Sequence, residues 1–314
     1  MGRITTVTLN PALDEAVALE SLVLGGKNRC SLDALDPGGK GVNASRVISR
    51  LGRSTIALGF AGGLTGDFLR EKLQAEGVSH RFVTVAEATR VNIMIYEYHD
   101  GRRSRLYLPG PTIAQSCLRE LELQLDAVEP GSVVIFGGSV PPGIPASVYR
   151  DLIRRLKSNG VQSVVDTSGA ALAAALEAAP AIIKPNVEEA SELLGRALPD
   201  DDAVLAAARE FQSMGAQRVV ISQAAAGAIC VEGSNAWKAV PPAVQSRATV
   251  GSGDSMVAGL AIGLDENCSI TEGLRLGTAA GAATAMVSGT SLCRARDVAA
   301  LLPRVTVGEL TAVA

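Results

Sequence analysis

A glycine-rich turn that carries one carboxylate, Gly251–Asp254 (GSGD), is the part of the sequence best suited to chemistry. The apolar stretch Met256–Leu264 follows it, so the turn is expected to begin a helix. Backbone N–H groups at such a start form an anion site at the positive end of the helix dipole. They can hold a phosphoryl group during its transfer, while Asp254 takes a proton from an attacking hydroxyl. The alternative is an ordinary capped helix start, because Asp is common in a first helical turn.

A second glycine cluster, Asp36–Asn43 (DPGGKGVN), also precedes a helical segment. Consecutive glycines let a ligand approach the backbone closely, and Asn43 can either cap the helix or hydrogen-bond a sugar hydroxyl. Lys27, Arg29 and Lys40 are near this cluster in the sequence. These three cations suit the capture of an anionic small molecule, or they form a solvated rim.

The segment Lys184–Glu189 (KPNVEE) leaves a predicted strand and enters a predicted helix. Asn186 and Glu189 have the spacing of a capping box, which is one explanation for both residues. The functional alternative is that they organise water and Mg²⁺ around nucleotide phosphates, since ligands of open α/β sheets bind at strand ends.

Three further residues are weaker candidates. Ser139 follows a strand within a Gly- and Pro-rich turn, where it suits hydrogen bonding to a substrate better than nucleophilic attack. Asp14 follows the first strand and can grip a hydroxyl or simply occupy a turn. Arg90 precedes a hairpin, where a phosphate contact and a plain surface charge are equal alternatives. Neither GxxxxGKS/T nor GxGxxG, the common nucleotide-binding patterns, occurs in the sequence.

The elements that must position these residues alternate between short apolar strands and amphipathic helices, as in a parallel sheet covered by helices. Continuous apolar runs such as SVVIF and RVVIS are typical of fully buried parallel strands. Strands are predicted at Thr55–Phe60, Ser132–Phe136, Val161–Val165, Ala181–Ile183 and Arg218–Ile221, and helices at Thr65–Glu76, Pro145–Asn159 and Ala203–Met214.

Two stretches break this rhythm by alternating polar and apolar residues. They are Arg29–Asp36 and Val91–Leu108, and the second contains Asp100-Gly101, a good hairpin signal. Half-exposed antiparallel strands attached to a parallel sheet predict a small lid over one of its edges.

Composition excludes several classes of protein. The 314 residues include 29 Lys and Arg against 32 Asp and Glu, and this near balance argues against nucleic acid as a partner. Two histidines without nearby cysteines make a zinc site improbable, and five cysteines without a CxxC pair suit a reducing cytoplasm. The uncharged run Leu276–Cys293 is long enough to raise the question of a membrane span, but it is built mainly from Gly, Ala, Thr and Ser, which favours close backbone packing instead.

Together the motifs resemble the ribokinase-like (PfkB) family of carbohydrate kinases, over nearly the whole chain from Thr8–Asp14 to Gly289–Cys293. The most specific matches are Pro37–Asn43 and Thr249–Gly259, which occur in the right order. The chain is similar to the phosphosugar branch, which contains minor 6-phosphofructokinase, 1-phosphofructokinase and tagatose-6-phosphate kinase. The resemblance implies an α/β fold: a Rossmann-type three-layer core with a mainly parallel sheet and a small β-lid. Residues 1–314 are then one kinase domain, with lid strands from about 27–36 and 90–109.

The resemblance also implies site residues and cofactors. It makes Asp254 the catalytic base, with Gly251, Ser252 and Gly253 as the anion hole. The residues that it places on the sugar phosphate are Asp14, Lys27, Arg29, Gly38, Gly39, Lys40, Asn43, Arg90 and Ser139. For ATP they are Lys184, Asn186, Ser222, Gln223, Gly227, Ser246, Thr249, Gly251, Gly253 and Thr284. Asn186 and Glu189 would act indirectly on Mg²⁺, and K⁺ would meet a loop of Ala248, Val250, Val287, Gly289 and Ser291, mostly through backbone oxygens.

The chain departs from the family pattern at Ser222–Gly227, which reads SQAAAG where the family usually has Ser-Leu-Gly. Ala224 lacks the backbone freedom of glycine, so nucleotide affinity or loop geometry is expected to differ. Lys40 is typical of the 1-phosphofructokinase and tagatose group, whereas Gly26–Arg29 and Leu108–Gly110 are closer to the minor 6-phosphofructokinase.

The leading hypothesis is a cytoplasmic kinase that phosphorylates the 1-hydroxyl of fructose 6-phosphate with ATP, and that forms a homodimer through its lid. The alternatives are 1-phosphofructokinase, tagatose-6-phosphate kinase, and a non-catalytic regulator that binds a sugar phosphate or nucleotide.

Overall fold

The computed structural model describes residues 4–247 and 250–310. Its main sheet has the order β14 (Thr306–Glu309), β13 (Asn235–Val240), β12 (Ala228–Glu232), β11 (Arg218–Ser222), β10 (Ile182–Ile183), β9 (Gln162–Asp166), β8 (Val133–Gly137), β1 (Ile4–Thr8), β4 (Thr55–Gly62) and β5 (Ser79–Val85). Strands β11 to β5 pair in parallel, and β12, β13 and β14 add an antiparallel edge. The α/β class with a mainly parallel sheet is therefore confirmed.

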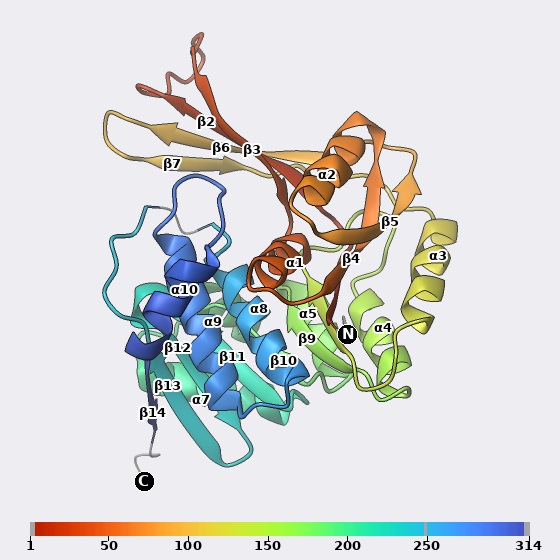
Figure 1. Cartoon of the computed structure of the whole chain (residues 1–314), viewed down its shortest axis with the longest axis vertical. Helices are drawn as coiled ribbons and strands as arrows, with labels where there is room; N and C mark the ends of the chain where they lie inside the picture. Colours follow the sequence, from red (N-terminus) through yellow and green to blue (C-terminus); the bar gives the residue numbers. More distant parts are fainter. Residues whose placement is uncertain (1–3, 248–249, 311–314) are drawn as a thin grey trace.

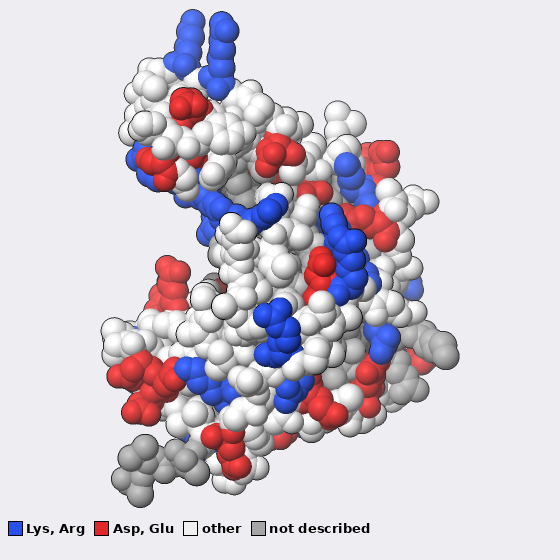
Figure 2. Space-filling model, turned by 60° about the vertical axis from the view of Figure 1, so that its left-hand side comes forward, with Lys and Arg blue, Asp and Glu red and all other residues white. Residues whose placement is uncertain are grey.

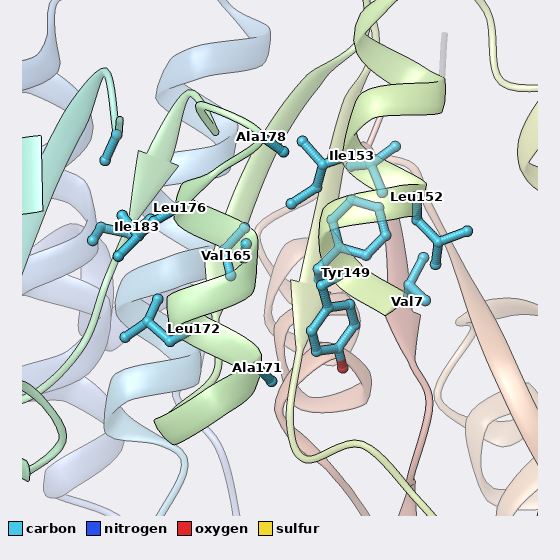
Figure 3. Close-up of a cluster of buried hydrophobic side chains, with 14 of the residues drawn as sticks. Val7, Tyr149, Leu152, Ile153, Val165, Ala171, Leu172, Leu176, Ala178 and Ile183 are labelled. Carbon is cyan, nitrogen blue, oxygen red and sulfur yellow. The ribbon is translucent and has the colours of Figure 1, made fainter. Parts of the chain in front are cut away.

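Helices cover both faces of this sheet (Figure 1). One face holds α3 (Gln115–Asp126), α4 (Val148–Lys157), α5 (Gly169–Leu176), α6 (Val187–Leu194) and α7 (Asp201–Ser213). The other holds α1 (Lys40–Arg50), α2 (Gly63–Ala75), α8 (Ser252–Asp265), α9 (Ile270–Ala285) and α10 (Ala295–Leu301). Alternate residues of one strand enter opposite cores, as β8 shows with Val134 on the first face and Val133 on the second. Figure 3 shows Tyr149, Leu152 and Ile153 of α4 gathered with Val7 of β1 in the first core.

Helices α8 and α9 pack against each other through small residues. A Cβ at Gly259 would lie 2.4 Å from the backbone nitrogen of Gly277, so the two backbones approach too closely for a side chain. This confirms that the small residues at the start of the Leu276–Cys293 run serve close packing. Within residues 4–247 and 250–310, no helix is long and apolar enough to cross a membrane.

A second sheet forms the lid, in the order β3 (Ser31–Gly38), β2 (Ala12–Leu19), β6 (Arg90–Glu97) and β7 (Arg103–Leu106). It projects from one end of the molecule (Figure 1). Strands β6 and β7 form the hairpin that Asp100-Gly101 predicts, and Gly101 has a φ of +73°. The central strand β2 is absent from the sequence-based prediction, and it pairs with β6 in parallel. The second sheet is thus mixed rather than purely antiparallel.

The rest of the chain, called the body below, contacts the lid through α1 and α2 and through two loops that form hydrogen bonds to it. The hydroxyl of Thr290, after α9, donates to Asp36 of β3. The guanidinium of Arg103 in β7 donates to the backbone carbonyl of Arg247, before α8. The lid therefore lies against the segments that precede α8 and follow α9.

Candidate active site

The carboxyl ends of the parallel strands meet at one edge of the main sheet, and polar residues gather there. Asp166 ends β9, Lys184 follows β10, and Asn186 caps α6. Lys40 begins α1, directly after lid strand β3, so the lid joins the body at this same edge. Figure 2 shows a hollow between the lid and the rest of the molecule. An edge of this kind is the usual ligand site of an open α/β sheet.

Asp254 lies in the first turn of α8, with its side chain buried at 8% exposure. The turn before it depends on Gly251, whose φ of +78° is left-handed. The amide nitrogen of Asn43 donates to Asp254 Oδ2 at 2.8 Å. Burial, followed by the negative charge of Asp166, raises the pKa of Asp254 to about 6, against the opposing effect of Lys40. A carboxylate with such a pKa suits a general base that works near neutral pH.

Asn43 is held in turn by a buried arginine. The Arg46 guanidinium is 1% exposed, donates to the backbone carbonyl of Pro37 at 2.8 Å, and lies 3.4 Å from Asn43 Oδ1. Glu76 neutralises Arg46 through an ion pair of 2.7 Å. Because its oxygen faces Arg46, the Asn43 side chain presents its NH₂ group to Asp254.

Asp166 is the centre of a charged cluster at the same edge. The Lys40 ammonium lies 2.8 Å from Asp166 Oδ1 and 2.8 Å from Glu189 Oε1, and Lys184 is 3.5 Å from Asp166 Oδ1. Burial alone would raise the pKa of Asp166, but Lys184 and Lys40 together lower it below its ordinary value. Asp166 Oδ2 is buried and has no hydrogen-bond partner among the described residues. The cluster therefore keeps one carboxylate oxygen free beside two ammonium groups.

The sequence-based reading missed Asp166, although a signal exists. Asp166 is the residue directly after the predicted strand Val161–Val165, where a charged side chain reaches the ligand edge.

This edge can hold an anion with an associated divalent cation. A Cβ at Gly253 would lie 3.4 Å from Lys184 Nζ, so the ammonium group lies over the start of α8 and its N–H groups. No cluster of three His, Cys, Asp or Glu side chains that could hold a metal exists among the described residues. Mg²⁺ commonly binds through one or two carboxylates plus phosphate and water, and the free oxygen of Asp166 fits that pattern.

Asn186 and Glu189 form the predicted capping box. The Asn186 side chain accepts from the Glu189 backbone at 2.7 Å, and Glu189 Oε2 accepts from the Asn186 backbone at 2.9 Å. The other Glu189 oxygen contacts Lys40. Capping and ligand-site organisation are thus compatible in the same two side chains. The family resemblance assigns Lys40 to the sugar phosphate. In the structure its ammonium group lies between Asp166 and Glu189.

A second polar group lies where the lid meets the body. The Asn10 side chain donates to Ser139 Oγ at 3.1 Å and to the Pro109 carbonyl at 2.9 Å. Arg90 donates to the Asn10 carbonyl at 3.0 Å, and its Nε has no partner among the described residues. Ser139 and Arg90 are therefore brought together, through an asparagine that the sequence-based reading did not select.

Asp14 lies on β2 and is buried at 6% exposure. It accepts a hydrogen bond of 2.8 Å from Asn92 of β6, and burial raises its pKa. Gly38 leaves room for this carboxylate, because a Cβ there would lie 2.2 Å from Asp14 Oδ2. Gly39 caps the start of α1, and its carbonyl accepts a hydrogen bond of 2.8 Å from the backbone nitrogen of Asn43. Asp14, Gly38 and Gly39 therefore lie close to Asn43.

Lys27 and Arg29 lie elsewhere. Both are exposed in the connection between β2 and β3, and neither has a hydrogen bond or ion pair with a described residue. This connection lies beyond Ala18, about 13 Å along β2 from Asp14 at 3.3 Å per residue. Figure 2 shows Lys and Arg side chains projecting from the far end of the lid. Within one chain, the two cations do not join the other predicted substrate residues.

The predicted nucleotide loop begins beside the capping box, where Ser222 bridges to Asn186. Gln223 donates to Asp201 at 2.9 Å rather than facing the edge with its amide nitrogen. Ala224 has a φ of +50°, a conformation that favours glycine, as the departure from the family pattern implies. Gly227 closes the loop, and Ser246 is exposed in the segment before α8.

The other predicted nucleotide and cation residues surround the end of α9. Thr284 is fully buried and links α9 to Ser255, at 2.7 Å, and to the Cys293 backbone, at 3.0 Å. The cation-loop residues Val287, Gly289 and Ser291 follow α9, and Val250 precedes α8. Ala248 and Thr249 lie outside the described residues.

Comparison with known proteins gives consistent matches. The sequence profile described as pfkB family carbohydrate kinase matches residues 7–296. The chain is 39% identical to ATP-dependent 6-phosphofructokinase isozyme 2 of Escherichia coli K12, covering 95% of this chain and 97% of that protein. It is 34% identical to 1-phosphofructokinase of Bacillus subtilis 168, covering 98% of this chain and all of that protein. The structure of phosphofructokinase-2 from Escherichia coli in complex with fructose-6-phosphate superposes with a TM-score of 0.90 at 37% identity, over 97% of this chain and 99% of that one. The structure of the same protein in complex with potassium superposes with a TM-score of 0.92 at 38% identity, with the same coverage.

Proposed function

We infer that this chain, which belongs to the pfkB family of carbohydrate kinases, transfers the γ-phosphoryl group of ATP to a hydroxyl of a hexose phosphate. The observation that carries this inference is the buried Asp254 at the start of α8, with a pKa raised to about 6, beside N–H groups that suit an anion. The Lys40–Asp166–Lys184 cluster at the same edge supplies the positive charge that a triphosphate requires.

We propose fructose 6-phosphate as the substrate and its 1-hydroxyl as the acceptor. The higher identity to a 6-phosphofructokinase isozyme 2 than to a 1-phosphofructokinase supports this choice. 1-Phosphofructokinase and tagatose-6-phosphate kinase activities are the alternatives, and they differ in where the existing phosphate lies.

The residues of the chain then divide the work. Asp14, with Asn43, would hold the sugar hydroxyls, and Asn43 would also orient the Asp254 carboxylate. Asp254 would accept the proton of the attacking hydroxyl, and the N–H groups of Gly251–Asp254 would stabilise the transferring phosphoryl group. Lys184 lies over those N–H groups and would neutralise charge there.

Mg²⁺ supplies charge neutralisation and alignment of the phosphates when bound. The free oxygen of Asp166 suits a direct or water-mediated contact, and Glu189 and Asn186 would act through water. For K⁺, backbone oxygens of Val287, Gly289 and Ser291 are the proposed contacts, and the potassium complex of the similar Escherichia coli protein supports this role.

We propose that the chain works as a single kinase domain over residues 1–314 and as a homodimer joined through the lid. The lid carries exposed apolar side chains, among them Leu32 at 63% and Tyr98 at 58% exposure, which a lid-to-lid contact would cover. The distance of Lys27 and Arg29 from Asp14 supports the same arrangement, because in a dimer they could complete the phosphate site of a second copy. We place the protein in the cytoplasm, where its five free cysteines would stay reduced.

The test is ADP release measured with a coupled assay over fructose 6-phosphate, fructose 1-phosphate and tagatose 6-phosphate. Fructose 6-phosphate is expected to give the highest kcat/KM. Preference for another member would move the assignment to the corresponding kinase. Absence of ADP with every member, together with measurable sugar-phosphate binding, would instead favour a non-catalytic regulator.

A further inference from the structure

A groove of about 670 Å³ lies on the body beside the loop between α9 and α10. Its lining includes three arginines from different parts of the chain: Arg50 at the end of α1, Arg247 before α8, and Arg294 before α10. We propose that this groove binds a small phosphate-bearing molecule at a site separate from the phosphoryl-transfer site.

The charges of the groove are unbalanced. Asp297 is the lining carboxylate, and it lies 3.4 Å from Arg296, which does not line the groove. Arg50 is tied to Glu76 at 3.1 Å. The Arg247 and Arg294 side chains are exposed, and neither has a hydrogen bond or ion pair with any residue that the structure describes. Two guanidinium groups are thus left to bind an anion.

The chemistry of the lining favours phosphate. A guanidinium offers a planar fork of donors that binds phosphate through two parallel hydrogen bonds. The volume lies in the range of about 300–1,000 Å³ that is typical of small-molecule sites. Val287 and Leu292 give the groove an apolar surface for the carbon part of such a ligand. Val287 and Ser291 belong to both the groove lining and the proposed K⁺ loop, but K⁺ would contact their backbone oxygens. The arginine side chains make the open part of the groove unfavourable for a cation and favourable for an anion.

The groove is separate from the phosphoryl-transfer edge. Lys40 and Arg50 begin and end α1, so they lie about 15 Å apart along the helix at 1.5 Å per residue. The loop that forms the groove nevertheless touches the anion turn, because a Cβ at Gly251 would lie 2.4 Å from Leu292 Cδ2. The carbonyl of Leu292 accepts a hydrogen bond of 2.7 Å from Arg50. The site therefore adjoins the back of the catalytic turn without sharing its N–H groups.

Titration calorimetry with inorganic pyrophosphate tests the proposal without relying on kinase activity. The wild type should bind pyrophosphate in two events, one at the phosphoryl-transfer edge and one at the groove. Arg247→Gln with Arg294→Gln should weaken only one event, by tenfold or more, because each lost charged hydrogen bond costs about 1.5–3 kcal/mol. Both positions are exposed, so unchanged thermal unfolding is the expected check on folding.

Arg296→Gln is the matched control, since Arg296 lies two positions after Arg294 in the sequence but outside the groove lining. It should bind pyrophosphate like the wild type. The proposal is overturned if the double variant keeps the wild-type isotherm, or if Arg296→Gln loses the same event. Failure of the kinase assignment would appear separately, as absence of ADP release, and would leave the groove event and its loss in the double variant unaffected.

Discussion

Replacement of Asp254 by Asn should stabilise the protein at neutral pH while it removes the proposed base. Asparagine has nearly the size of aspartate, and its carbonyl oxygen can still accept the 2.8 Å hydrogen bond from Asn43. What disappears is a buried negative charge that lies in the field of Asp166.

The magnitude follows from the pKa of Asp254, which rises from 3.8 to about 6 on folding. A shift of about two units corresponds to about 3 kcal/mol. Because the folded pKa is raised, the folded state binds the proton more tightly than the unfolded chain. The carboxyl group is neutral in both states below about pH 4, so it costs nothing there. The cost develops between about pH 4 and 6 and is complete above that range.

Urea unfolding of the wild type and Asp254→Asn at pH 4 and at pH 8 measures this difference. The two proteins should have similar free energies of unfolding at pH 4, and the variant should be more stable by about 3 kcal/mol at pH 8. Asp67→Asn, whose carboxylate is 73% exposed, serves as the control and should show no such pH-dependent gain. A variant that is no more stable than the wild type at pH 8, or a difference independent of pH, would refute the reasoning.

Three further predictions concern the supporting residues. Lys40→Met should move the acidic limb of kcat/KM to higher pH, because the ammonium group lowers the pKa of Asp254, and an unmoved limb would contradict this. The same variant leaves Asp166 with one cation fewer, so urea unfolding should show a loss of about 2 kcal/mol, below the 3–5 kcal/mol of fully buried pairs. Ala224→Gly should raise the free energy of unfolding by about 1 kcal/mol by relieving a φ of +50°, and a loss of stability would oppose that view. Arg46→Met should lower the free energy of unfolding by about 2–3 kcal/mol, since Glu76, directly after α2, loses its buried partner but keeps Arg50, and a loss below 1 kcal/mol would argue against that pairing.

The sequence predicts the main elements because their signals are local. The apolar runs of β8 and β11 and the Asp-Gly of the β6–β7 hairpin each lie within a few residues. Strand β2 was missed because its order depends on pairing with β6, where Asp14 meets Asn92 from 78 positions away. Asn10-Pro11 signals a turn after β1, but the adjacent acidic residues Asp14 and Glu15 interrupt the alternation expected of a strand, so no local pattern marks β2.

The site divides in the same way. Asp254 and Asn43 were found because each lies in the first turn of a helix that follows glycines, and both lie at the ligand edge of the sheet. Asp166 was missed because its significance comes from Lys40, 126 positions away, and from Lys184, which follows the next strand. No local pattern reveals that an ammonium group will bridge two distant carboxylates, so Lys40 was assigned from its neighbours in the sequence alone.

The most direct test of the account is identification of the product by ³¹P NMR after incubation of the protein with ATP, Mg²⁺ and fructose 6-phosphate. The wild type should form a new phosphate monoester on the 1-hydroxyl, and Asp254→Asn should form it at a rate lower by about 10²–10⁴-fold. Absence of a sugar bisphosphate with the wild type, or a variant that forms it at a near-normal rate, would contradict the central claim.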